Sequence, residues 1–194
     1  MENLQLPQDL QENGKPVIVL DLDDTIISSS LIKMKPSSFA VKVGNRRYAY
    51  INTRPGFLEF IKEIKNKFEV FFFTASTKAY GNQIIDIISP DTPSSHRLFR
   101  NSCENISGYL VKDLRKINRP LNKIILIDDL QGSALLQPEN LVHITSWYDD
   151  ENDTVLLNQL LPILQRIEKS NNLSTTFKKI ISQETGHYND LSSF

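Results

Sequence analysis

The sequence contains a single cysteine, Cys103, among its 194 residues. A disulfide within the chain is therefore excluded, which fits a protein kept in a reducing compartment. Cys103 has no histidine near it in the sequence, so a small buried apolar residue is a better interpretation than a nucleophile. The three histidines, His96, His143 and His187, lack the spacing of metal ligands. Any chemistry must therefore come from other residue types.

The chain also has almost no net charge and no long apolar run. Its formal net charge is −1, which gives no indication of the basic surface typical of nucleic-acid or anionic-membrane binding. No apolar run approaches the roughly 20 residues of a membrane span, and no signal pattern opens the chain. We expect an intracellular protein, nuclear or cytoplasmic, without a membrane or a direct nucleic-acid partner; its oligomeric state is left open.

The hydrophobic residues, 40% of the chain, suffice for one substantial core. Short apolar runs at 17–20, 70–73, 124–127 and 141–144 predict buried strands, and apolar residues at helical spacing predict helices over 57–68, 78–88 and 153–167. Asp153 is expected to cap the last helix, and Pro162 to kink or restart it. Strands that alternate with helices predict an α/β fold with a central parallel sheet.

An insertion follows the first predicted strand. Residues 39–43 and 46–51 are β-prone and flank Gly44-Asn45, which together predict a small β-hairpin near the end of that strand. We expect the domain to extend over residues 16–168. Residues 1–15 form a polar lead-in, and the polar tail 169–194 is expected to be a peripheral helix or disordered.

Acidic residues crowd the end of the first predicted strand. Asp21, Asp23 and Asp24 are followed by Thr25. Side chains alternate in an extended segment, so Asp21, Asp23 and Thr25 are expected to project together while Asp24 faces away. Crowded carboxylates need a positive partner, and this end of a parallel sheet is where ligands bind. The alternative is an acidic turn without a function.

Further candidate groups come near the other predicted strands. Thr74 ends the second, Asp128 and Asp129 end the third, and Lys112 lies in the irregular segment before it. Several carboxylates with a cation and a hydroxyl suit Mg²⁺ and a phosphoryl group. An aspartate in such a site can form an aspartyl-phosphate, while a second acts as general acid and base. The alternatives are a solvated Lys112 and a Thr74 that merely ends its strand.

The motif DLDDT at residues 21–25 matches the D-x-D-x-T signature of the haloacid dehalogenase superfamily of phosphotransferases. FFFTAS, GYLVKDL and IILIDD resemble its later motifs. RPGFLEF, LFRNSC and SWYDDENDT resemble one branch, the phosphatases of the C-terminal tail of RNA polymerase II and their small relatives. The resemblance implies a three-layer Rossmann-like fold with a hairpin insertion. It also implies a Mg²⁺-dependent protein serine/threonine phosphatase that acts on Ser-Pro phosphopeptides such as that tail.

The resemblance also implies the roles of the acidic residues. Asp21 would be the nucleophile and a metal ligand, and Asp23 the general acid and base that offers its backbone carbonyl to the metal. Thr25 would steady the loop between them. Asp129 would bind Mg²⁺, and Asp128 would hold a metal-bound water or Lys112.

Three further residues are implied to bind the substrate phosphate: Thr74, Lys112 and Arg100, for which an ion pair within the fold is the alternative. Apolar residues of the insertion, Phe39, Val41, Val43, Tyr48 and Tyr50, could line an apolar notch beside the phosphoserine, as the resemblance suggests. The alternative is an ordinary hairpin that packs its apolar face on the core. One departure stands out: Leu130-Gln131 occupies the place where the family usually has Ser-Pro. We interpret it as a change in loop shape.

Two other functions compete with a protein phosphatase. The first is a non-catalytic binding module of the same family, against which the intact acidic residues argue. The second is a small-molecule phosphatase of the same superfamily. Such enzymes usually exclude peptides with a lid, whereas we expect a compact site without a large cap domain, which should admit a phosphorylated peptide.

Overall fold

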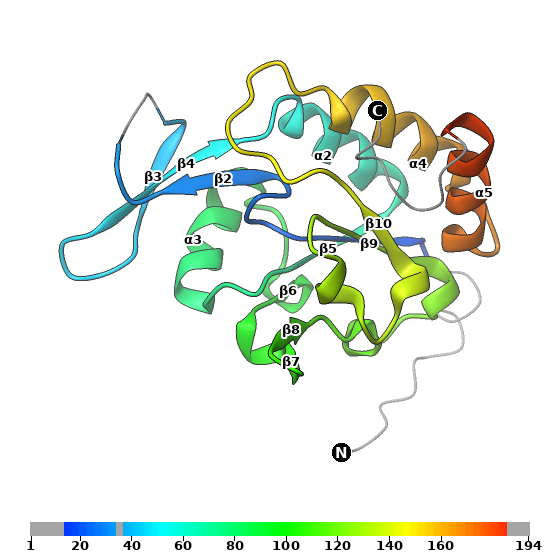
Figure 1. The fold of residues 1–194 in the computed structure, drawn as a ribbon, viewed down its shortest axis with the longest axis horizontal. Helices are drawn as coiled ribbons and strands as arrows, with labels where there is room; N and C mark the ends of the chain where they lie inside the picture. Colours follow the sequence, from blue (N-terminus) through cyan, green and yellow to red (C-terminus); the bar gives the residue numbers. More distant parts are fainter. Residues whose placement is uncertain (1–13, 34–36, 186–194) are drawn as a thin grey trace.

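The computed structural model describes residues 14–33 and 37–185. Residues 1–13 of the expected lead-in and the last nine residues of the expected tail lie outside this part. Figure 1 shows the arrangement of the elements. The strands are β1 (Val17–Leu20), β2 (Ile27–Ser30), β3 (Phe39–Lys42), β4 (Tyr48–Thr53), β5 (Glu69–Phe73), β6 (Arg97–Leu98), β7 (Glu104–Ile106), β8 (Tyr109–Val111), β9 (Ile124–Asp128) and β10 (Leu141–His143). The α-helices are α2 (Phe57–Lys67), α3 (Lys78–Ile88), α4 (Leu161–Ile167) and α5 (Leu173–Thr185).

A parallel sheet in the order β10-β9-β1-β5-β6 forms the centre of the molecule. Val19 of β1 pairs with Phe71 of β5 on one side and with Leu126 of β9 on the other. The four residues of β1 are fully buried, because both neighbouring strands and both faces cover them. This confirms the predicted α/β fold. The carboxyl ends of β1 and β9 lie side by side, so the acidic residues that end them meet.

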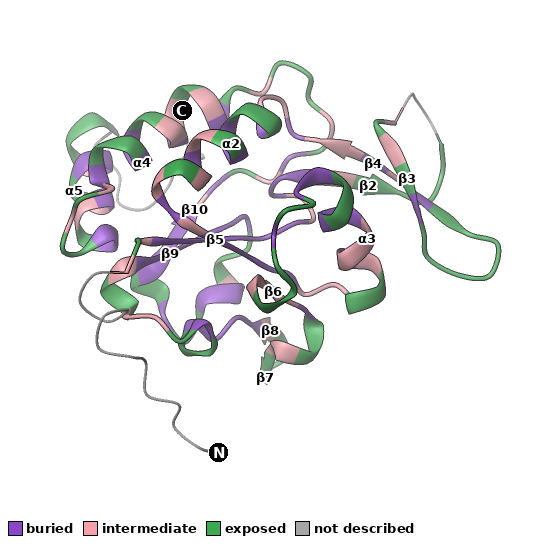
Figure 2. Cartoon of the chain, turned by 180° about the vertical axis from the view of Figure 1, so that it is seen from behind, coloured by how far each residue is buried: buried purple, intermediate pink, exposed green. Residues whose placement is uncertain are grey.

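The two faces of the sheet are covered differently. Ile18, Leu20 and Phe72 belong to a large apolar cluster with the inward residues of the α-helices. Val19 and Phe71, which point the other way, pack with Leu114, Ile117 and Ala134 of short 3₁₀ turns. Figure 2 shows the buried strands between these coverings. The fold thus has three layers, with short turns as one outer layer.

The insertion is a three-stranded antiparallel sheet in the order β2-β4-β3. The predicted hairpin is confirmed as β3–β4, and it projects from one side of the body (Figure 1). The third strand, β2, was not expected because its serines lack an apolar alternation. It forms because Ile27 and Ser28 pair with Thr53 and Asn52 of β4.

The register of the insertion contradicts the expected five-residue notch. Val41 lies opposite Ala49, and both are buried in the core. Tyr48 and Tyr50 alternate with Ala49 along β4 and therefore point to the opposite face of this sheet. Phe39 and Val41 consequently cannot line one pocket with these tyrosines. Within the described insertion, only Tyr48 and Tyr50 remain for such a notch, because Val43 continues the alternation of Phe39 and Val41 and so belongs to their face.

The C-terminal helical region begins with a π-helical turn, Val155–Leu160, that continues into α4. Pro162 lies at the start of α4, where the π-helical turn gives way to the α-helix, and its missing N–H fits this change of helix type, which corresponds to the predicted restart. The N-cap is Thr154 and not Asp153 as predicted, but Asp153 lies one residue before it and its Oδ1 accepts the backbone N–H of Val155 at 3.1 Å. Helix α5 buries Leu173 and Phe177 in the core cluster. Every helix in the described part of the chain is too short or too polar to cross a membrane.

Candidate active site

The chain turns sharply after β1 and does not stay extended. The backbone N–H groups of Thr25 and Ile26 donate to the carbonyl of Leu22 at 3.3 and 3.0 Å, and Asp24 has a left-handed φ of 58°. The extended alternation expected for residues 21–25 is therefore wrong. Asp21 and Thr25 still meet, because the turn carries Thr25 back over the end of the strand.

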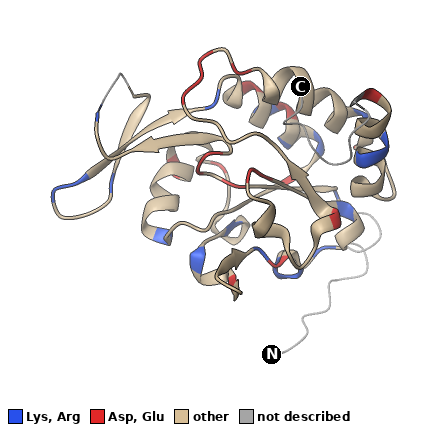
Figure 3. Ribbon diagram, in the orientation of Figure 1, with Lys and Arg blue, Asp and Glu red and all other residues tan. Residues whose placement is uncertain are grey.

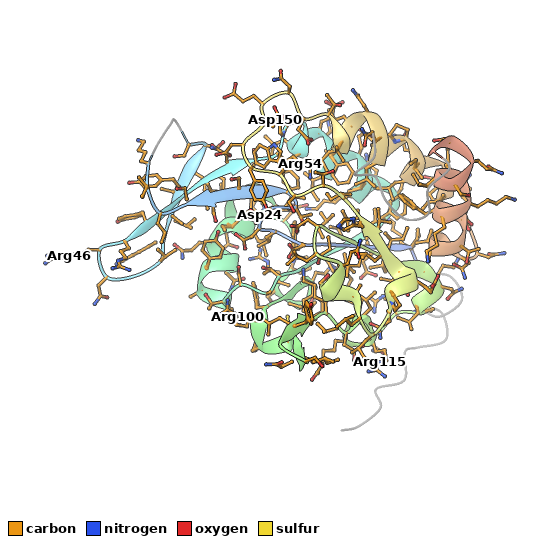
Figure 4. All side chains as sticks on the ribbon, in the orientation of Figure 1. Asp24, Arg46, Arg54, Arg100, Arg115 and Asp150 are labelled. Atoms are coloured by element: carbon orange, nitrogen blue, oxygen red, sulfur yellow. The ribbon has the colours of Figure 1, made fainter. Side chains whose placement is uncertain are left out.

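Asp24 lies within electrostatic reach of the acidic groups, although it is not one of the three described carboxylates that could hold a metal ion. Burial raises the pKa of its carboxyl, and the nearby charges of Asp129 and Asp23 raise it further. Its backbone carbonyl accepts the N–H of Trp147 at 2.7 Å. The backbone of Asp24 thus connects the turn to the segment after β10. Asp24 is labelled in Figure 4.

Lys112 lies at the centre of the site, only 3% exposed. Its Nζ is 2.5 Å from Asp21 Oδ1 and 2.6 Å from Asp128 Oδ2. Thr25 Oγ1 lies 2.9 Å from Asp129 Oδ1 and 3.3 Å from Asp21 Oδ2, and it accepts the backbone N–H of Asp129 at 3.1 Å. The structure thus brings together five of the residues singled out in the sequence. They lie at the carboxyl ends of β1, β8 and β9 and in the turn after β1: Asp21, Thr25, Lys112, Asp128 and Asp129. Figure 3 shows acidic residues in loop segments near the middle of the molecule.

The electrostatics of this cluster are unbalanced. Burial raises the pKa of Asp21, and Asp128 and Asp23 add to the rise, although Lys112 opposes it. Burial also disfavours the charge on Lys112, but Asp128 and Asp21 outweigh it and raise the pKa of the ammonium. One buried cation therefore faces several buried carboxylates. Such a cluster favours an additional cation.

The oxygens of this cluster fit a metal ion. Within the described residues, one carboxylate oxygen each from Asp21, Asp128 and Asp129 lie within 4.8 Å of one another. Opposite ligands of an octahedral Mg²⁺ are roughly 4.2 Å apart, since each lies about 2.1 Å from the ion. Hard carboxylate oxygens are the donors that such a cation prefers. The cluster could hold a divalent cation.

Asp23 has different surroundings from Asp21. Its carboxylate accepts hydrogen bonds from Ser76 Oγ at 2.6 Å and Tyr80 Oη at 2.7 Å. Burial raises the pKa of Tyr80, and the charge of Asp23 adds to it, so the phenol stays a donor. Sequence reasoning did not single out Ser76 or Tyr80 as site residues. Their only signal was that Ser76 ends the FFFTAS motif and Tyr80 follows it by four residues.

Thr74 and Arg100 lie on this side of the site. Thr74 is buried, and its Oγ1 accepts the backbone N–H of Ser76 at 3.0 Å. Arg100 is exposed and donates from Nε to the carbonyl of Ala75 at 2.7 Å. In the described part of the chain Arg100 forms no ion pair, so the structural alternative considered for it is not observed. Figure 4 shows Arg100 at the edge of the molecule, next to α3.

Arg54 is a second residue that sequence reasoning missed. Its guanidinium is fully buried and makes a bidentate pair with Asp153, at 2.8 Å from Nε and 2.7 Å from Nη2. Its Nη1 donates to the backbone carbonyls of Thr25 and Thr145, each at 3.0 Å. Arg54 therefore ties together three segments that surround the acidic cluster. The only sequence signal was the RPG at the start of α2.

A hollow of about 520 Å³ opens beside the cluster. Asp21, Lys112, Asp128 and Asp129 line one part of it, and residues 108–110 and 130–133 line another. A second hollow of about 430 Å³ lies far from these acids, among Glu69, His96 and Arg119. It contains no comparable cluster. The first hollow is therefore the candidate substrate site.

Asp128 and Asp129 differ in a way that predicts their effects on metal binding. Asp128 is paired with the Lys112 ammonium, whereas in the described part of the chain the carboxylate of Asp129 accepts hydrogen bonds from the hydroxyls of Thr25 and, at 2.7 Å, Ser146. The charge of Asp129 is thus the less neutralised. We expect Asp129→Asn to weaken Mg²⁺ affinity at least about 10-fold more than Asp128→Asn. Titrating activity and thermal stability with Mg²⁺ measures both, and the reverse order would contradict this assignment.

Comparison with known proteins agrees with this geometry. The family model described as "NLI interacting factor-like phosphatase" matches residues 16–174. Phosphatase PSR1 of Saccharomyces cerevisiae is 36% identical over 170 residues, which cover 86% of this chain and 40% of that protein. A probable C-terminal domain small phosphatase of Dictyostelium discoideum is 37% identical, covering 86% of this chain and 55% of that protein. The chain spans about half the length of the curated relatives it matches.

The fold is also similar to a solved structure. The structure described as that of Fcp1, an essential RNA polymerase II CTD phosphatase, superposes with a TM-score of 0.61. It covers 90% of this chain and 68% of that chain, at 19% sequence identity. At this identity the likeness concerns the fold alone.

Proposed function

The chain belongs to the NLI interacting factor-like phosphatase family, and from this premise we propose that it is a Mg²⁺-dependent protein serine/threonine phosphatase. It hydrolyses phosphoserine in Ser-Pro peptides, such as those of the RNA polymerase II C-terminal domain, through an aspartyl-phosphate. The observation that carries the proposal is the buried Lys112 between Asp21 and Asp128, with Asp129 beside them. Phosphoryl transfer requires such a combination of positioned charges.

In the first half of the reaction, an Asp21 carboxylate oxygen bonds to phosphorus as the bond to the seryl oxygen breaks. Lys112 and Thr25, which contact the two Asp21 oxygens, hold the carboxylate for this attack. Asp23 gives its proton to the departing seryl oxygen. Lys112 and Thr74 donate to the phosphate oxygens, and the exposed guanidinium of Arg100 is a further candidate contact.

In the second half, Asp23 takes a proton from a water molecule that attacks phosphorus, and the bond to Asp21 breaks. Ser76 and Tyr80 fix the orientation of Asp23 through this exchange. A Mg²⁺ ion held by Asp21, Asp129 and the Asp23 carbonyl, with Asp128 beside it, would neutralise charge on the phosphoryl oxygens. Phosphate then leaves, and Asp21 is restored.

The two rival functions predict different assays. A non-catalytic module would hydrolyse nothing, and a small-molecule phosphatase would prefer sugar phosphates. We expect hydrolysis of an aryl phosphate that requires Mg²⁺ and stops with EDTA, and a higher kcat/KM for a phosphoserine-proline peptide than for sugar phosphates. Absence of aryl phosphate hydrolysis would favour the module, and preference for sugar phosphates would favour the small-molecule enzyme.

A further inference from the structure

The hollow beside the acidic cluster has an apolar wall that the proposed reaction does not use. Tyr109, Leu110 and Leu130 line it, with Gly132 between them. Tyr109 is 56% exposed and Leu130 is 62% exposed. A contiguous apolar surface that borders a charged binding site marks a place where a ligand buries an apolar group.

Tyr109 is carried by a tight hairpin. Ile106 of β7 pairs with Tyr109 of β8, so only Ser107 and Gly108 form the turn. Both have positive φ, 52° and 88°, as two-residue hairpin turns require. Asn105 Oδ1 also accepts the N–H of Gly108 at 3.2 Å. The backbone that presents Tyr109 is therefore well defined.

The Tyr109 ring rests on Gly132 of the 3₁₀ turn Gln131–Ala134. A Cβ at position 132 would lie 2.5 Å from Tyr109 Cδ1, closer than non-bonded atoms approach. Glycine thus lets the hairpin and this turn meet. Leu130 directly precedes this turn and lines the same hollow. Its side chain and the Tyr109 ring give this side of the hollow its apolar character.

The wall is fixed to the acidic cluster by hydrogen bonds. The N–H of Leu130 donates to Asp128 Oδ1 at 2.8 Å. The N–H of Lys112 donates to the carbonyl of Ser133 at 2.7 Å. A group bound against the wall is thus held at a defined place relative to Asp21 and Lys112.

We propose that Tyr109 and Leu130, seated around Gly132, form a subsite for an apolar side chain that neighbours the phosphoserine of the substrate peptide. This proposal rests on the protein phosphatase function proposed above. The hollow is continuous from Asp21 to Leu130, so a peptide whose phosphate reaches Asp21 lays an adjacent residue on the wall. Asp128 and Asp129 in the same hollow repel an acidic side chain there. The preferred occupant is therefore a leucine-like or aromatic residue.

The test uses a host peptide with phosphoserine-proline among alanines. Each of the two positions before phosphoserine and the two positions after the proline is changed in turn to leucine or to aspartate, and kcat/KM is measured. We expect leucine at one position to raise kcat/KM about 10-fold over alanine, and aspartate there to lower it. In Leu130→Asn and Tyr109→Ala the leucine and alanine peptides should be hydrolysed with nearly equal kcat/KM.

Two further variants complete the experiment. Gly132→Ala adds a Cβ that displaces the Tyr109 ring and should also reduce the leucine preference, although it removes no apolar group. Leu58→Asn is the matched control, because Leu58 is 68% exposed on α2 and does not line the hollow. It should keep the full leucine preference.

Peptide hydrolysis with no leucine preference at any position would overturn the subsite alone. The same holds if the preference persists in both Leu130→Asn and Tyr109→Ala. Hydrolysis of aryl phosphate without hydrolysis of any phosphopeptide would overturn the proposed function, and the subsite with it. The two failures are therefore distinguishable.

Discussion

Asp21→Asn is expected to abolish turnover, lowering kcat by roughly 10⁴-fold or more, as removal of a covalent nucleophile does in other enzymes. The amide keeps the size of the side chain but cannot attack phosphorus. Its oxygen can still accept a hydrogen bond from Lys112, which now donates to Asp21 Oδ1 at 2.5 Å. Single-turnover assays with a phosphopeptide measure the loss. Substantial residual activity would sink the aspartyl-phosphate mechanism.

The same variant should remain folded, and its stability should depend less on pH. Burial raises the pKa of Asp21 from 3.8 to about 7. The Asp21 carboxyl therefore binds its proton more tightly in the folded state than in the unfolded chain. This difference stabilises the folded state at low pH, and the stabilisation is lost as the pH rises from about 4 to about 7. In EDTA, the Tm of wild type should thus fall relative to Asp21→Asn as the pH rises from about 4 to about 7. A large loss of Tm in the variant at every pH would mean that Asp21 is chiefly structural.

The position of the acidic cluster could be predicted from the sequence, because it depends on strand ends. The apolar run of β1 and the acids that follow it are local signals, and β9 carries the same pattern. Parallel strands place their carboxyl ends together whatever the connections between them. Asp21 and Asp129 therefore meet for a reason that a single sequence contains.

The direction of Asp23 could not be predicted in this way. It depends on the turn in which Asp24 takes a positive φ. Glycine is the usual sequence signal for this conformation, and the turn contains none. Its partners Ser76 and Tyr80 lie 53 and 57 residues away, and their hydroxyls leave no periodic pattern. The contact of Tyr109 with Gly132 is hidden for the same reason, since it joins a hairpin to a distant turn.

Arg54 is the strongest case of a residue without a local signal. Its partner Asp153 lies 99 residues away along the chain, and an arginine before proline at a helix start is usually a solvated residue. Only the fold reveals that its side chain is wholly buried. This pairing therefore could not be inferred from spacing or periodicity.

Arg54→Leu is expected to lower the free energy of unfolding by about 3–5 kcal/mol, because it leaves the carboxylate of Asp153 without its buried partner. It also removes the hydrogen-bond donor for the backbone carbonyls of Thr25 and Thr145. Each carbonyl is then left without a partner or must bind a water molecule instead. Chemical denaturation followed by circular dichroism measures the change. Arg54→Lys is the informative companion, since it keeps the charge and loses the two-pronged geometry.

The consequence should reach the site through Thr25. Because Arg54 holds the Thr25 carbonyl and Thr25 Oγ1 contacts Asp129, loosening the turn should also weaken Mg²⁺ affinity. Arg54→Lys, if folded, should therefore need a higher Mg²⁺ concentration for half-maximal activity. Asp153→Asn leaves the two carbonyl contacts of Arg54 in place, so it should change this Mg²⁺ concentration less. If Arg54→Lys is less stable than wild type but requires the same Mg²⁺ concentration, Arg54 only stabilises the fold. A residue that positions Asp129 must change metal binding when its own hydrogen-bond geometry is lost.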